Sequence, residues 1–392
     1  MKRALSSLFL AEALSRALSF FIIIYVSRVL GATELGYWSY ALAINAFLII
    51  ATNLGLDVYA MVEATKDIAK REKLYINTIT IKMLLTFVAL GLLWSLYNLI
   101  EIKVLLLITT LLVADLLSSI TPVWYYQVAE DFKTIATIKI TQAISYFLLA
   151  ILLLWWQKSI IMLAVAYLGA YLVSMLIYGR AIFKRIDFSS IEPHHWHKIL
   201  KVSLYLGGAL FLNQIYTNTD KIMIAHMLGV TYNGYYEAGY KLYAFVPVIF
   251  SIIWTVFAPK VAKEKIYFTK FAVLIVSTAL FIAAIFYIKK EFLIIKLYGT
   301  SFIPTVELMN YFALSIAALG LSYIATSPLA LFEKNKEWFW IVFCSFLLNI
   351  SLNYLLIPTM QLKGAVLATV AAESMTALLG LKILYKAYKE RE

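Results

Sequence analysis

The stretch Leu30–Trp38, with the sequence LGATELGYW, recurs as LGVTYNGYY at Leu228–Tyr236, 198 residues further along the chain. Five of the nine residues are identical, and each copy joins two long apolar segments. Any tight hairpin between helices favours glycine, which tolerates backbone conformations that larger residues resist. The shared offset of almost half the chain nevertheless favours an internal repeat. The candidate hinge or gating positions are the glycines of the two copies: Gly31, Gly36, Gly229 and Gly234.

Composition indicates the solvent in which these two halves fold. Of 392 residues, 63% are hydrophobic and 14% are charged, and the mean hydropathy is +0.84. A soluble globular chain is about half apolar and a quarter charged. This chain has too much apolar surface for one water-soluble core, and its single cysteine, Cys344, excludes an intrachain disulfide framework. We therefore expect an integral membrane protein.

Continuous apolar segments of about 20 residues, the length that crosses a bilayer as a helix, account for most of the chain. They fall at 8–28, 35–57, 78–98, 104–126, 135–156, 159–179, 201–226, 234–258, 269–288, 305–331, 338–357 and 363–385. Membrane β-strands would instead be shorter and would alternate polar and apolar residues. The fold class predicted is an all-α integral membrane protein with about twelve transmembrane helices.

An even number of spans in each half makes both halves insert with the same orientation, as in transporters built from parallel repeats. The predicted domains are an N-terminal six-helix bundle at 1–180, a cytoplasmic linker at 181–200 and a C-terminal six-helix bundle at 201–392.

The basic residues behind the net charge of +12 lie mainly in alternate short loops, for example around 66–73, 180–201 and 260–270. This is the positive-inside pattern of multi-pass proteins, and it predicts that both termini face the cytoplasm. The N-terminal segment is interpreted as a retained first helix, because Glu12 and Arg16 interrupt it and no clear cleavage site follows. The basic excess therefore needs no nucleic-acid partner.

Short motifs occur in a characteristic order along essentially the whole chain. They are Ser27–Gly31 with Gly36–Tyr37, Asn53–Leu56, Trp124–Gln127, Asp220–Ile222, Leu297–Gly299 and Lys363–Ala365. In order and spacing they resemble the polysaccharide flippases, the Wzx-type branch of the multidrug/oligosaccharidyl-lipid/polysaccharide exporter superfamily.

The resemblance implies two helical bundles around a central cavity that opens alternately to each side of the cell (inner) membrane. It also implies the substrate, a polyprenyl-diphosphate-linked oligosaccharide of the O-antigen type, turned from the inner to the outer leaflet. The partners expected are membrane lipids and, as candidates, a polysaccharide polymerase and chain-length proteins. No cofactor is expected, and a proton or a sodium ion is the candidate coupling ion.

Charged residues inside the spans cost about 2.5–3.5 kcal/mol each at mid-bilayer, so each one needs a reason. Facing a hydrated cavity, cations would attract a diphosphate, and polar groups would bond sugar hydroxyls or carry a coupling ion. The candidate substrate-binding cations are Arg16, Lys82, Lys221 and Lys241. The candidate cavity-lining or coupling groups are Glu12, Asp57, Asp115, Asn213, Gln214, Thr217, Asn218, Asp220 and Glu237.

The alternative is that acid and base neutralise each other so that the helices can insert and pack. Glu12 and Arg16 lie one helical turn apart, as do Glu237 and Lys241. Equal depth in neighbouring spans also predicts a bridge between Asp220 and Lys241. Lys82 has no partner in its own helix.

Two further charged residues have alternative interpretations. Arg28, at the outer end of the first span, is either a gate or a structural anchor. Glu373 is a weaker candidate for the coupling ion, and we expect it to form an interhelical hydrogen bond instead.

His194, His195 and His197 have metal-like spacing, but no Cys or further His completes a ligand set. We interpret them as an interfacial loop and predict no metal site. The chain also lacks a Gly-x-x-x-x-Gly-Lys-Ser/Thr loop and a nucleophile–base motif, so we predict that it is not an enzyme.

Several other functions stay open. A drug or cation antiporter of the same superfamily would need a compact acidic pocket. A membrane glycosyltransferase or polymerase would need a larger extracytoplasmic loop than this chain has. A non-transporting scaffold of a polysaccharide assembly complex is compatible with the same pattern.

Overall fold

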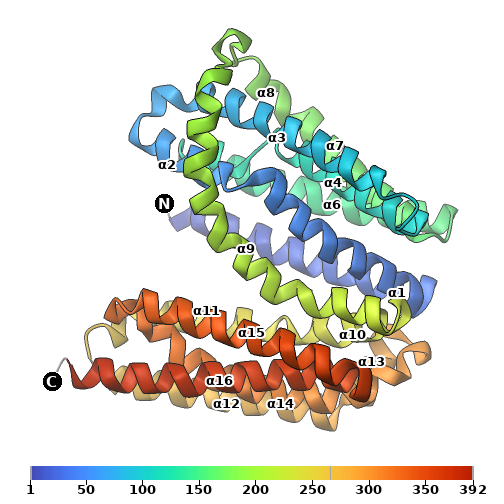
Figure 1. The fold of residues 1–392 in the computed structure, drawn as a ribbon, viewed down its shortest axis with the longest axis vertical. Helices are drawn as coiled ribbons and strands as arrows, with labels where there is room; N and C mark the ends of the chain where they lie inside the picture. The colour runs from blue at the N-terminus through green and yellow to red at the C-terminus, as the bar shows by residue number, and fades with distance from the viewer. Residues whose placement is uncertain (1, 265, 391–392) are drawn as a thin grey trace. The chain divides into compact units, whose positions relative to one another are not determined.

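The computed structural model describes the backbone of residues 2–264 and 266–390 (Figure 1). Side chains are described within these ranges except at 2–6, 206, 208–213, 215 and 216. All regular elements of the described chain are helical. By its internal contacts the chain divides into two compact units. Unit 1 comprises Met1–Leu30 and Tyr37–Asn218, and unit 2 comprises Gly31–Gly36 and Thr219–Glu392.

Helix α1 (Lys2–Asn53) belongs to unit 1 except for Gly31–Gly36, which belong to unit 2. The other helices of unit 1 are α2 (Leu56–Lys66), α3 (Arg71–Ser95), α4 (Ile102–Ser118), α5 (Val123–Gln127), α6 (Phe132–Trp156), α7 (Ile160–Ser174) and α8 (Arg180–Phe183). The long helix α9 (Trp196–Met227) runs from unit 1 into unit 2. Residues 201–218, which the sequence analysis grouped with the second half, belong to unit 1 by their contacts. The remaining helices are α10 (Val230–Tyr243), α11 (Val246–Val261), α12 (Ile266–Ile288), α13 (Lys290–Tyr298), α14 (Ile303–Thr326), α15 (Asn335–Met360) and α16 (Leu362–Lys389).

Ten helical segments of the described chain are long and apolar enough to cross a membrane. The first, Ser7–Asn53, spans 47 residues and breaks at Gly31, whose φ is 82°, so it contains two of the predicted spans. Large apolar side chains such as Phe87 and Phe281 are 61% and 68% exposed, as expected where lipid is the solvent. The all-α membrane fold predicted from the sequence is confirmed.

In unit 1, α3 and α5 pack together through a cluster of aromatic side chains. Tyr75 of α3 lies 5.6 Å from Tyr125 of α5, ring centroid to centroid, and Trp124 lies 5.9 Å from Tyr125. Both contacts are edge-to-face, the geometry that the ring quadrupole favours. Pro122 interrupts the predicted span 104–126, so α4 ends at Ser118 and α5 starts a new turn.

The segment between α8 and α9 is docked on unit 1 through one buried side chain, Asn77 of α3. Its Nδ2 donates to the carbonyl oxygen of Ser190 at 2.9 Å. Its Oδ1 accepts from the backbone N–H of Glu192 and from Trp196 Nε1, both at 2.9 Å. The predicted linker is therefore held by specific hydrogen bonds at the base of α9.

In unit 2 the two copies of the repeated motif pack directly against each other. We call this contact, between residues 31–36 and 230–234, the repeat seam. A Cβ at Gly36 would overlap the carbonyl oxygen of Val230, and a Cβ at Gly234 would overlap that of Ala32. Thr33 Oγ1 lies 2.9 Å from Thr231 Oγ1. Glycine is required at both positions because the two backbones touch.

Candidate functional site

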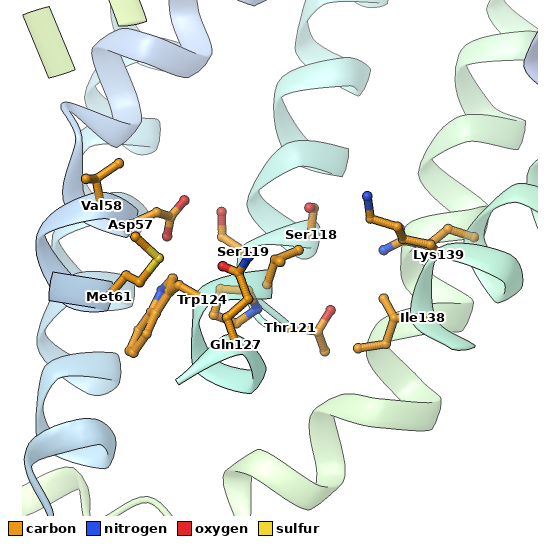
Figure 2. A pocket seen from close by; sticks show the side chains of 13 residues that line it. Asp57, Val58, Met61, Ser118, Ser119, Thr121, Trp124, Gln127, Ile138 and Lys139 are labelled. Carbon is orange, nitrogen blue, oxygen red and sulfur yellow. The ribbon is translucent and has the colours of Figure 1, made fainter. Parts of the chain in front are cut away.

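Three adjoining pockets form a polar hollow within unit 1. The largest, the Trp124 pocket, has a volume of about 310 Å³ and is lined from α2, α4, α5 and α6. Figure 2 shows Asp57 on one side of it, Lys139 on the other, and Ser118 and Ser119 between them. The pocket shares Asp57 with a second pocket and Lys139 with a third. We call the three together the unit 1 hollow.

The second pocket, the Lys82 pocket, has a volume of about 190 Å³ and contains an ion pair. Lys82 Nζ of α3 lies 2.7 Å from Asp57 Oδ1 of α2, and the Lys82 side chain is only 6% exposed. Asn53 Nδ2 donates to the other Asp57 oxygen at 2.7 Å. The sequence left Lys82 without a partner because pairing within one helix cannot reveal a carboxylate on the neighbouring helix.

Asp115 of α4 also lines the Lys82 pocket. Its Oδ2 accepts a 2.6 Å hydrogen bond from Asn45 Nδ2 of α1. Asn45 is 3% exposed, and its Oδ1 is a buried atom for which the described residues supply no hydrogen-bond partner. This pocket therefore contains two carboxylates and one lysine.

The third pocket, the Tyr167 pocket, has a volume of about 200 Å³ and is built around Glu12 of α1. Arg16 pairs with Glu12 Oε1 at 2.9 Å, which confirms the predicted pairing within the helix. Lys139 of α6 pairs with Glu12 Oε2 at 2.7 Å. The pocket is also lined by Ser15, Ser19, Gln142, Ala143, Tyr146, Tyr167, Ala170 and Tyr171. One carboxylate thus serves two cations, an arrangement that we call the Glu12 triad.

Lys139 was not among the predicted site residues, although it lies inside the predicted span 135–156. The signal was available, because a lysine in an apolar span is itself costly. Gln142, one helical turn further on, extends the same polar face into the hollow.

Unit 2 contains a second triad, centred on Glu237 of α10. Its carboxylate lies 2.9 Å from Lys221 Nζ of α9 and 3.2 Å from Lys241 Nζ of α10. The Glu237 side chain is 1% exposed, and Lys221 Nζ also lies 4.6 Å from the centre of the Tyr240 ring. We call this arrangement the Glu237 triad.

The predicted bridge between Asp220 and Lys241 is wrong. Lys241 pairs instead with Glu237, one turn earlier on its own helix. Asp220 accepts hydrogen bonds from residues of α15 and α16. The Asp220 carboxylate accepts from Asn353 Nδ2 at 2.6 Å, from Tyr236 Oη at 3.0 Å and from Thr369 Oγ1 at 3.3 Å. Asn353 in turn bonds Asn349 Oδ1 at 3.1 Å. The spacing of Asn349 and Asn353, one turn apart in an apolar span, was the overlooked signal.

The remaining predicted polar residues of α9 make local bonds. Asn218 Nδ2 donates to Gln214 Oε1 at 2.9 Å, and Thr217 Oγ1 donates to the Gln214 carbonyl at 3.3 Å. The side chain of Asn213 lies outside the described residues. The interhelical hydrogen bond expected for Glu373 is confirmed, because Ser322 Oγ of α14 donates to it. Arg28 is exposed near the Gly31 break in α1.

The docked linker brings Glu192 beside two of its histidines. Potential ligand atoms of Glu192, His194 and His195 lie within 4.8 Å of one another. Lys73 Nζ lies 2.7 Å from Glu192 Oε1, and this ion pair lowers the pKa of the Glu192 carboxyl. Glu192 was not among the predicted ligands, because only Cys and His were counted there.

Comparison with known proteins relates this arrangement to a family. No curated protein shows significant sequence similarity to the chain. Among solved structures, the lipid II flippase MurJ in an inward closed conformation matches with a TM-score of 0.76 and 15% identity, over 96% of this chain and 87% of that one. An inward-facing MATE multidrug resistance transporter of the MOP superfamily matches with a TM-score of 0.70 and 13% identity, over 94% and 96%.

A MOP superfamily transporter from Pyrococcus furiosus, described as having a binding pocket of reversed polarity, matches with a TM-score of 0.62 and 11% identity, over 98% and 95%. At these identities the neighbours show the fold alone, which is that of MurJ and MATE transporters. The sequence model described as "Polysaccharide biosynthesis protein" matches residues 1–265, more than half of the chain. The chain therefore belongs to the polysaccharide biosynthesis protein family, and its fold is similar to that of the MurJ and MATE structures.

Proposed function

We propose that this protein flips a polyprenyl-diphosphate-linked oligosaccharide from the inner to the outer leaflet of the cell membrane by alternating access. The charge imbalance of the Glu12 triad carries the proposal. Arg16 and Lys139 share one carboxylate, so the triad has one positive charge in excess. Their side chains are 54% and 35% exposed, which leaves donors accessible to a diphosphate. Arg and Lys donors form strong charge-assisted bonds to phosphate oxygens.

The other predicted cations differ in how well they suit this role. Lys82 fits it poorly, because Asp57 already neutralises it in a nearly closed environment. Lys221 and Lys241 also share a single carboxylate and carry an excess positive charge. Lys241, with 33% of its side chain exposed, is the more accessible of the two.

The sugar moiety would bind beside the Glu12 triad. Tyr146, Tyr167 and Tyr171 line the same pocket, where the Tyr167 and Tyr171 hydroxyls lie 3.1 Å apart. Aromatic faces and hydroxyls together suit a ring that is apolar on one face and carries hydroxyls at its edge. Gln142 adds an amide that can both donate and accept.

The coupling ion would bind in unit 2, around Asp220. A carboxylate, two carboxamides from Asn349 and Asn353 and the Thr369 hydroxyl gather there. Asn353 Oδ1 is buried without a hydrogen-bond partner among the described residues. Oxygen donors of this kind suit a hard cation such as Na⁺, and a proton could occupy the same carboxylate.

We further propose a location in the inner membrane with both termini in the cytoplasm, since basic residues concentrate in alternate loops. A polysaccharide polymerase and chain-length proteins are the proposed partners, because they would act on the flipped product. Reporter fusions at each terminus test the orientation.

The experiment is reconstitution of the purified protein into liposomes that contain a fluorescent polyprenyl-diphosphate oligosaccharide. Appearance of the label in the opposite leaflet is followed by quenching from outside. We expect the double variant Arg16→Gln, Lys139→Gln to lose most translocation. The matched control is Lys66→Gln, which removes an exposed cation paired with Glu63. Undiminished flipping by the double variant would refute the assignment of the Glu12 triad.

A cation antiporter is the second candidate, favoured by the two carboxylates of the Lys82 pocket and by the MATE-like fold. The same liposomes distinguish the two functions. Organic-cation efflux without lipid translocation would support the antiporter and contradict the flippase.

A further inference from the structure

The carboxylate of Asp115 is the least compensated acid in the unit 1 hollow. Its side chain accepts one hydrogen bond, from Asn45 Nδ2 at 2.6 Å. Within the described residues no salt bridge reaches it, whereas Glu12 has two cationic partners and Asp57 has one. An intramembrane carboxylate with so little compensation is costly unless another positive charge joins it.

Asn45 provides a second, independent sign of a missing ligand. The residue is 3% exposed, and its Oδ1 has no hydrogen-bond partner among the described residues. A buried acceptor left unpaired costs about 1–3 kcal/mol. This oxygen belongs to the same carboxamide that bonds Asp115, so an orphaned acceptor lies beside an under-compensated anion. Such a pair of oxygens calls for a cation or a proton.

The charges around Asp115 show which cation would fit. The groups near it on the neighbouring helices are Asn45 on α1, Asp57 on α2, Lys82 on α3, and Tyr167 and Tyr171 on α7. The tyrosines are neutral, and Lys82 compensates Asp57. One negative charge remains, which a single monovalent cation would neutralise. The pocket of about 190 Å³ has room for such an ion and its water.

Unit 2 contains the same arrangement. Asp220 accepts from Asn353 Nδ2 at 2.6 Å, and Asn353 Oδ1 is also orphaned. Asp220 has additional donors in Tyr236 and Thr369, so Asp115 is the less satisfied of the two carboxylates. Each unit therefore has one Asp–Asn pair with an unpaired carboxamide oxygen.

We propose that Asp115 and Asn45 bind a monovalent cation, either Na⁺ or a proton, as a second ion site independent of the Asp220 cluster. Its role in driving transport rests on the proposed function, but its occupancy does not. In the cation-free state Asp115 accepts from the Asn45 amide. On binding, the Asn45 carboxamide turns so that Oδ1 replaces Nδ2 beside Asp115. Na⁺ then contacts the carboxylate and Asn45 Oδ1, or protonated Asp115 donates a hydrogen bond to Asn45 Oδ1.

The test measures cation binding by the purified full-length chain in nanodiscs, without lipid-linked substrate. Binding of ²²Na⁺ at pH 8 is compared in the Asp220→Asn background with and without Asp115→Asn. A pH-indicator dye reports, in parallel, the protons taken up between pH 8 and pH 5. We expect Asp115→Asn to remove either one bound Na⁺ or one titrating proton. The control Glu63→Gln removes a carboxylate that is paired with Lys66 and lines none of the three pockets, and it is expected to change neither measurement.

A second variant keeps the test valid if Asp115→Asn does not fold. Asn45→Leu retains the carboxylate but removes the orphaned oxygen, and should weaken Na⁺ binding about tenfold or more. If neither variant alters Na⁺ binding or proton uptake, the Asp115 site is refuted. Failure of lipid translocation with cation binding intact would instead refute the proposed flippase and leave this site standing.

Discussion

The Glu12 triad of unit 1 and the Glu237 triad of unit 2 contain the same charges in opposite surroundings. In each, two cations share one carboxylate, but the Glu12 side chain is 41% exposed and that of Glu237 is 1% exposed. Burial changes what the carboxylate does. An exposed triad can exchange its partners for an incoming anion at little cost, whereas a buried one holds its helices together. Equal charge patterns in a sequence can therefore have different roles.

The largest expected effect comes from removing the buried carboxylate. Glu237→Ala leaves Lys221 and Lys241 without their partner, and breaking a buried ion pair in this way costs about 3–5 kcal/mol. Thermal unfolding in detergent measures the loss of stability. Glu12→Gln is the matched control, and we expect it to cost less than about 1 kcal/mol because its ion pairs are exposed. Equal losses in the two variants would show that burial does not distinguish the stabilising roles of the two triads.

A smaller loss of stability is expected from mutation of the repeat seam, a second tightly packed region of unit 2. Gly36→Ala places a Cβ on the carbonyl oxygen of Val230, and forced overlap of this kind costs about 1–3 kcal/mol. Gly91→Ala in α3 of unit 1 is the control, because no atom lies within 4 Å of its added Cβ. The control should be neutral or slightly stabilising, since alanine favours a helix. A stable Gly36→Ala protein would show that the seam can open without strain.

The hydrogen bonds of Asn77 to the segment between α8 and α9 make this part of unit 1 a candidate rigid region. Asn77→Ala removes the acceptor for Glu192 N–H and Trp196 Nε1, and leaving these half-buried donors unpaired costs about 1 kcal/mol. Limited proteolysis between α8 and α9 should become faster in this variant. The control is Asn53→Ala, which removes an amide bonded to Asp57, away from this segment. Unchanged cleavage would mean that other contacts hold the linker.

The smallest effect is expected from the exposed pair of Lys73 and Glu192. Lys73 lowers the pKa of Glu192 below its ordinary value of 4.5. The pair therefore contributes stability above pH 4.5, and the contribution is lost as the pH falls through the lowered pKa. The melting temperatures of the wild type and of Glu192→Gln should differ slightly at pH 7 and converge in acid. A difference that grows in acid would contradict this sign.

The fold was largely predictable from the sequence. Only helices and closed β-barrels can span a lipid bilayer, and long continuous apolar segments indicate helices. Pairings within one helix, such as Glu12 with Arg16, were also predictable from spacing. Contacts between helices were not, since the depth of a residue along its helix does not give the direction of its side chain. Lys82 with Asp57, Lys139 with Glu12, and Asp220 with Asn353 all belong to this class.

The repeat seam places each copy of the duplicated motif against its own counterpart. Thr33 meets Thr231, and Gly36 lies between Val230 and Gly234 just as Gly234 lies between Ala32 and Gly36. Each copy of the motif thus forms the packing surface for the other. A mutation in one copy changes the surface against which the other copy packs. A substitution in one loop therefore requires either a matching substitution in the other or none. That mutual constraint is a physical reason for the five identities between the two nine-residue copies.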